Sequence, residues 1–139
     1  MSEVPLCGPD DLAVSLYWER DGQGLRGTVV AENVGTRTCR SGMKPGVQPL
    51  GLDGVPLPTD TLVSAEMRRP AHVVLEPGDR AAAPVSWRNW TGAPAGDRAI
   101  VGWNGGESVV VVEVDAPRQP GCRPGVPENL TSSWFNPLD

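Results

Sequence analysis

This 139-residue chain lacks several features that would point to a function at once. It has one histidine, His72, and its longest apolar run is Val109 to Val112. A membrane-spanning helix needs about 20 apolar residues, so direct membrane insertion by a helix is not expected. A metal site or a Ser-His-Asp arrangement would have to use His72, and the sequence around it supplies no partners at suitable spacing. The sequence therefore predicts no catalytic residue, no metal site and no cofactor.

Positive charge is also scarce. The formal net charge is -5, and Lys44 is the only lysine. The densest basic cluster consists of Arg37, Arg40 and Lys44, in a segment rich in turn residues. Nucleic-acid binding normally requires a concentrated basic face, so we do not expect a nucleic-acid partner.

Aromatic residues make up only 5% of the chain, and five of them are tryptophans. The 17 glycines and 15 prolines are too many for long helices but are normal for short strands joined by turns. We therefore expect one domain with an aliphatic core, in which buried indoles supply most of the large apolar surface.

The first half of the chain has the period of two that is typical of half-buried strands. In Asp11–Glu19, apolar residues alternate with smaller or polar ones, and the turn residues of Arg20–Gly24 follow. Leu25–Gly35 then returns with the same alternation. The two segments are predicted to form an antiparallel hairpin.

Further alternating or β-branched segments continue to the C-terminus, whereas Thr59–Pro70 has no clear period. Strands are predicted at Val47–Leu52, His72–Leu75, Arg80–Arg88, Arg98–Trp103, Ser108–Asp115 and Leu130–Phe135. Their phase places Trp87 and Trp103 in the core. About eight or nine short strands with no long helical pattern predict an all-β fold, an antiparallel β-sandwich.

Four short motifs occur in a fixed order. They are CGPDDL from Cys7, ENVG from Glu32, TRTCRSGMKPGV from Thr36 and LEPGD from Leu75, with a late cysteine, Cys122, after them. In order and spacing this resembles the family catalogued as domain of unknown function 4232, from Cys7 to about Cys122. The resemblance implies an immunoglobulin-like sandwich within a single domain, residues 1–139, with a core of about 7–122 and a C-terminal extension of 123–139.

The resemblance also implies a subcellular location and a pairing of the cysteines. Family members are commonly secreted or envelope-anchored actinobacterial proteins, so an extracytoplasmic location is expected; if Met1 is the native start, the location would be cytoplasmic. The family's pattern implies a pair between Cys7 and Cys39. The first hairpin also favours it, because Cys7 precedes its first strand and Cys39 follows its second, so both lie at the same end. Closing that loop would contribute about 3 kcal/mol. The alternative pair, Cys7 with Cys122, remains open.

Members often have a further cysteine where this chain has Gly92–Asp97, and its absence leaves Cys122 as a free thiol. The resemblance brings no accepted activity. We therefore expect a non-enzymatic module that binds a protein or glycan partner, or a structural spacer, with Trp90 and Trp134 as partner-binding residues if their indoles are exposed. The alternative is a redox or thiol-dependent protein that uses Cys122, with arginines nearby in the sequence to favour its thiolate.

Overall fold

The fold was analysed in a computed structural model, which describes ten stretches of the chain. They are residues 4–21, 24–41, 45–59, 61–63, 73–88, 90, 95–103, 106–115, 129–133 and 135–138. These stretches contain eleven strands and no helix. The predicted all-β fold is confirmed.

The first hairpin forms the centre of the fold. Strands β1 (Leu12–Asp21) and β2 (Gly24–Asn33) pair antiparallel along their whole length, from Leu12 opposite Asn33 to Asp21 opposite Gly24. The buried positions of β2 alternate as the sequence predicts, because successive side chains of a strand point to opposite faces. Strand β7 (Arg80–Arg88) adds to the other edge of β2, also antiparallel.

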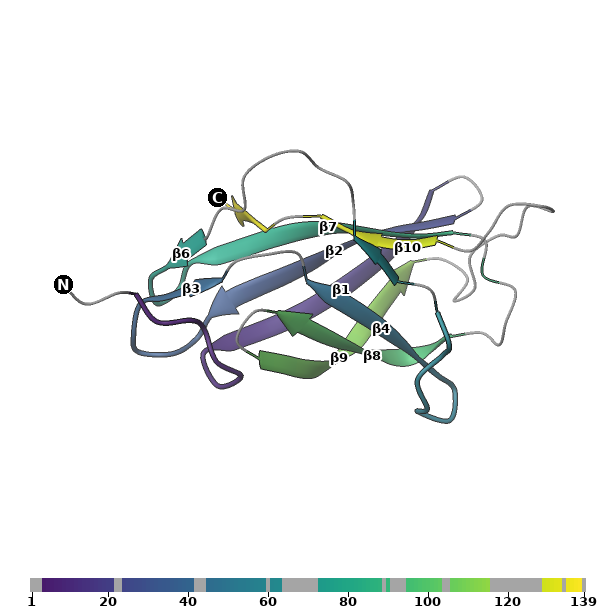
Figure 1. The fold of residues 1–139 in the computed structure, drawn as a ribbon, viewed down its shortest axis with the longest axis horizontal. Coiled ribbons are helices and arrows are strands. Elements are labelled where there is room, and N and C mark those ends of the chain that lie inside the picture. Colours follow the sequence, from purple (N-terminus) through teal and green to yellow (C-terminus); the bar gives the residue numbers. More distant parts are fainter. Residues whose placement is uncertain are drawn as a thin grey trace.

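A second layer consists of β4 (Gly46–Gly51), β8 (Ala95–Trp103) and β9 (Gly106–Asp115), which pair antiparallel in that order. Figure 1 shows β2, β7 and β10 along the upper side of the molecule and β4, β8 and β9 along its lower side. The apolar faces of the two layers meet in one core. The layer that contains β1, β2 and β7 therefore packs against the layer of β4, β8 and β9.

The first strand belongs to both layers. Beside its antiparallel partner β2, β1 pairs in parallel with β9 from Leu16 to Glu19. The path β4-β8-β9-β1-β2-β7-β10-β5 is therefore one continuous mixed sheet folded on itself, rather than two separate antiparallel sheets. Alternating hydrophobicity shows which face of a strand is buried but not its neighbour, so the parallel pair could not be predicted from sequence.

Three strands complete the edges of the upper layer. Strand β10 (Asn129–Ser132) pairs antiparallel with β7, and β5 (Thr61–Val63) pairs in parallel with β10. Strand β11 (Asn136–Leu138) also pairs with β7, beyond a break opposite Ala83 and Pro84. The predicted terminal strand is thus present, and the segment expected to be an extension of the core contributes two strands to the main sheet.

A separate two-stranded sheet lies at the end of the sandwich. It pairs β3 (Cys39–Ser41) with β6 (Val73–Leu75). Strand β3 was not predicted: the sequence at this point indicates only a loop that carries a cysteine, because three residues are too few to show a period.

Tryptophans fill the centre of the core. Trp87 is fully buried and Trp103 is 8% exposed, as their phase predicts. Trp18 and Trp90 both pack against Trp87, with ring centroids 6.2 and 5.9 Å from its own. Tilted aromatic pairs at such distances contribute more than their buried area alone, so these three rings join β1, β7 and the residues after β7.

Candidate functional site at the disulfide end

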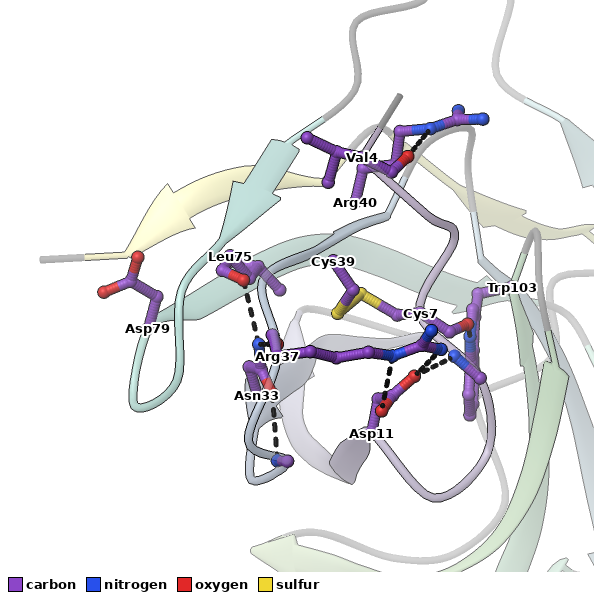
Figure 2. Close-up of a disulfide and its surroundings, with 12 residues drawn as sticks. Val4, Cys7, Asp11, Asn33, Arg37, Cys39, Arg40, Leu75, Asp79 and Trp103 are labelled. Atoms are coloured by element: carbon purple, nitrogen blue, oxygen red, sulfur yellow. Dashed lines mark hydrogen bonds and ion pairs between the residues drawn. A yellow bond between two sulfur atoms is a disulfide. The ribbon is translucent and has the colours of Figure 1, made fainter. Parts of the chain in front are cut away.

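Described residues of the four sequence motifs meet at one end of the two packed layers. There β1 begins, β2 ends and β7 begins, and the small β3-β6 sheet covers them. Figure 2 shows this end, with the disulfide between Cys7 and Cys39 at its centre. We refer to it as the disulfide end.

Asn33, the last residue of β2, organises the loop that follows it. Its side-chain Nδ2 donates hydrogen bonds to the carbonyl oxygens of Arg37 and Leu75, both at 2.8 Å, and its Oδ1 accepts one from the Gly35 backbone N–H at 2.9 Å. The side chain is almost fully buried. An asparagine amide has two N–H donors and one oxygen acceptor, so these three contacts give each of its polar groups a partner.

The turn of the LEPGD motif binds the same residue from the other side. Asn33 N–H donates to Asp79 O at 2.9 Å, and Gly78 N–H donates to Asn33 O at 2.8 Å. Gly78 has a φ of 94°, in the left-handed region that glycine adopts without strain. The NVG and LEPGD motifs, 42 residues apart at Asn33 and Leu75, therefore form one hydrogen-bonded unit.

The disulfide fixes the N-terminal segment to this unit. Cys7 and Cys39 are bonded and fully buried, 32 positions apart in sequence. Around them, Cys7 N–H donates to Arg40 O at 2.9 Å, Arg40 N–H donates to Pro5 O at 2.8 Å, and Arg40 Nε donates to Val4 O at 2.8 Å. Residues 4–7 therefore run beside β3 as a short added strand, held both covalently and by hydrogen bonds.

The indole of Trp103 connects the disulfide end to the lower layer. Its Nε1 donates to Cys7 O at 2.9 Å, a buried contact. Trp103 is the last residue of β8, so this bond ties the N-terminal segment to the second layer. A buried indole N–H needs a partner, and the carbonyl of Cys7 satisfies it.

An ion pair closes the outer side of the site. Arg37 Nη2 donates to Asp11 Oδ2 at 2.8 Å, and Gly8 N–H donates to the same carboxylate at 2.7 Å. These donors, Arg37 first, hold the pKa of Asp11 below its ordinary value because they favour the charged form. The Asp11 side chain is 14% exposed and that of Arg37 is 55% exposed, so the cation faces solvent.

A model of the family described as Domain of unknown function (DUF4232) matches residues 7–131. The chain belongs to this family. No curated protein and no solved structure matches it. In this DUF4232 domain the matched region begins at the bonded Cys7 and ends within β10, so it includes every contact of the disulfide end described above except those of residues 4 and 5.

The described polar groups of the site bind one another rather than line a cavity. No group of three or more His, Cys, Asp or Glu side chains that could hold a metal ion is found among the described residues. Nor do those residues include a helix long and apolar enough to cross a membrane. The groups that the site presents to solvent include the Arg37 guanidinium and Val34, which is 54% exposed.

The predicted site residues of the DUF4232 domain have different outcomes in the structure. Cys7 and Cys39 form the disulfide that the resemblance implies. Trp90 is only 7% exposed, because its ring packs against Trp87, so it does not offer the exposed indole on which its expected binding role depended. Trp134 and Cys122 lie outside the described residues, as does His72.

The structural importance of Asn33 and Asp11 was missed by sequence reasoning. The available signal for Asn33 was the Asn-x-Gly spacing, which is typical of an asparagine that hydrogen-bonds the backbone two residues on. In the sequence, Asp11 stands out only as the first residue of the alternating segment Asp11–Glu19. Its partner Arg37 is 26 residues away, and no local pattern relates the two.

The tryptophan cluster leaves little room for a ligand. A cavity of about 10 Å³ lies between the layers, lined among others by Trp18, Leu25, Trp87 and Ala95. That volume holds about one water molecule. This cavity, as the described residues line it, is therefore a small packing defect of the core and not a binding site.

Proposed function

We propose that this domain is a non-enzymatic, immunoglobulin-like module of an actinobacterial cell-envelope or secreted protein, which binds a protein or glycan partner or serves as a structural spacer. The observation that carries the proposal is the fully buried disulfide between Cys7 and Cys39. Disulfides persist in oxidising compartments and are rare in the cytosol, so a bond built into the centre of the hydrogen-bonded end supports an extracytoplasmic location.

The shape of the disulfide end supports a binding role. Loops that a rigid sandwich holds in place are common sites of recognition, because the scaffold fixes them before a partner arrives. Here the disulfide, Asn33 and the Asp11–Arg37 pair fix the loop that presents Val34. A pre-ordered loop loses little conformational entropy on binding.

The compartment is tested by counting thiols. Protein from the native host's extracytoplasmic fraction is alkylated under denaturing conditions without reductant, and its intact mass is measured. We expect a single alkyl adduct, at Cys122, with peptide mapping joining Cys7 to Cys39. Three adducts would contradict the proposal and would favour a cytosolic protein, in which the thiol of Cys122 should then be tested for reactivity.

The binding role is tested by photo-crosslinking in intact cells. A photoreactive amino acid replaces Val34 at the disulfide end or, as a matched control, Leu52 in the turn after β4 at the other end; both side chains are exposed. A discrete crosslinked species from position 34 alone is expected if the disulfide end binds a partner. If neither position gives a crosslink, the spacer role is favoured.

A further inference from the structure

The outer face of the lower layer combines apolar side chains with the opposite charges of Arg98 and Glu107. In β8 and β9 the inward positions are filled by core residues, and the outward positions face solvent in rows across the two strands. Ile100 lies opposite Val109, and Arg98 lies opposite Val111. Val109 is 59% exposed and Val111 is 65% exposed, so the middle of this face is an uncovered apolar surface.

Next to this surface the face is hollow. Gly46 of β4 and Gly102 of β8 are in register, and neither has a side chain to fill the outer side of the sheet. A Cβ added at Gly46 would meet nothing within 4 Å, and one at Gly102 would meet only the Cβ of Glu107, at 4.0 Å. The resulting depression is about 230 Å³, open to solvent, with Ile100 and Gln48 on one side and Glu107 at its rim.

Among the described side chains, Arg98 and Glu107 of this face have no ion-pair partner. Both side chains are exposed. Arg98 lies on one side of the Ile100–Val109 row and Glu107 on the other. A face with opposite charges on either side of an apolar centre is complementary to itself after a half-turn.

We propose that this face binds a second copy of the same chain. A two-fold axis along the Ile100–Val109 row lays β8 of one copy across β8 of the other with the strands reversed. Arg98 of each copy then enters the hollow above Gly102 of its partner and meets Glu107 at the rim. The apolar residues of the two rows pack against each other in the centre.

The long, planar side chain of arginine suits this role. Its methylene groups can lie on the glycine floor of the hollow while the guanidinium pairs with a carboxylate in fork geometry. Because the two Arg98–Glu107 contacts are related by symmetry, one face supplies both halves of the recognition.

The dimer is expected to be weak. The outer face of these three strands is expected to bury less than the roughly 800 Å² per partner of a standard interface. In addition, each copy carries a net charge of -5, and the two copies repel each other at long range. We therefore expect a dissociation constant of about 10 to 1,000 µM, the range of a weak, transient complex.

The test measures the mass of the full chain as its concentration rises. Sedimentation equilibrium is carried out from about 10 µM to 2 mM in a buffer near physiological ionic strength. We expect the weight-average mass to rise above the monomer mass of 14.7 kDa. A mass that stays at the monomer value up to the highest concentration would overturn the proposal.

Charge exchange tests the geometry itself. Arg98→Glu and Glu107→Arg each place like charges face to face and should each keep the chain monomeric over the same range, whereas the double variant R98E/E107R should restore the dimer. Arg80→Glu, an exposed arginine at the start of β7 in the other layer, makes the same change in net charge and should associate like the wild type. Failure of the double variant to associate, or equal loss in R80E, would show that this face is not the interface. Circular dichroism of each variant confirms that the fold is retained.

Discussion

Asn33 shows how much of this fold depends on one polar side chain. It is the meeting point of the loop after β2 and the turn before β7, through hydrogen bonds from its side chain and its backbone. Apolar packing alone does not orient such loops, because it has no direction. A buried amide does, because each donor and acceptor accepts partners only along certain directions.

Removing that amide should be costly. In Asn33→Ala the carbonyl of Leu75 loses its side-chain donor in a buried position, and we expect the free energy of unfolding to fall by about 2 to 3 kcal/mol. Asn33→Asp keeps the shape and the acceptor but not the donors, so it should lose at least as much. Urea unfolding followed by tryptophan fluorescence measures both.

Thr36→Ala serves as the control for these variants, since Thr36 is exposed in the same loop. Its stability should match the wild type. If Asn33→Ala were equally harmless, the loop would be held by its backbone and the disulfide alone.

The Asp11 carboxylate gives the domain an acid-sensitive contact. Folding lowers the pKa of Asp11 through the Arg37 and Gly8 donors, so the ionised pair stabilises the fold at pH values above the carboxyl's ordinary pKa. That contribution is lost as the pH falls through the lowered value. The thermal midpoint of the wild type should therefore exceed that of Asp11→Asn at pH 7, and the difference should shrink towards pH 2.

Asp10→Asn, one residue away and exposed, is the matched control for this profile. Its midpoint should follow the wild type across the same pH range. A constant difference between the wild type and Asp11→Asn from pH 7 to pH 2 would contradict the assigned role of the ion pair.

Among the elements, the long strands were predictable, whereas two of the three-residue strands, β3 and β5, were not. The alternation in β1, β2 and β7 extends over nine or ten residues, and its buried face appears in the structure as predicted. Strands β3 and β5 have three residues each, too few for a period of two to be recognised. They exist because neighbouring edges supply hydrogen-bond partners, a property of the assembled sheet.

The N-terminal segment is the element that the disulfide stabilises most directly. Residues 4–7 have only a short ladder with β3, so the covalent bond carries much of their attachment. In the chain-entropy model, a disulfide that closes a loop of this length stabilises the fold by about 3 kcal/mol, because it restricts the unfolded chain. Reduction, or the double variant Cys7→Ala/Cys39→Ala, should lower the free energy of unfolding by about that amount.

Urea unfolding with and without reductant measures this loss. The reductant should have no further effect on the double variant, which is the control for changes elsewhere in the chain. An unchanged midpoint in the wild type after complete reduction would show that the hydrogen bonds of the segment are sufficient.

At the scale of the whole molecule, the C-terminal strands complete the upper layer. Strand β10 covers the edge of β7, and Leu130 within it is 1% exposed. The sequence pattern predicted one strand here, whereas the family resemblance implied that residues 123–139 are an extension beyond the core. The pairing with β7 joins residues more than 40 positions apart, which no local pattern contains.

If these strands belong to the fold, Leu130→Ala should behave as a core substitution. It should lower the free energy of unfolding by about 2 to 4 kcal/mol, the range for a buried leucine. The matched control is Leu52→Ala, the same substitution at a residue that is 73% exposed, which should change stability little. If urea unfolding showed the same small change in the free energy of unfolding for both variants, β10 would not contribute to the core.

The sequence by itself determined the all-β class, the buried faces of the long strands, the burial of Trp87 and Trp103, and the family. The class and the burial depend on local composition or on a period of two, which neighbouring residues encode directly. The family depends on the order and spacing of short motifs along the chain. Only the tertiary structure decided the parallel pairing of β1 with β9, the union of Asn33 with the LEPGD turn, the Asp11–Arg37 pair and the burial of Trp90. These depend on which distant segments lie side by side, and that follows from packing the apolar faces of all the strands into one core.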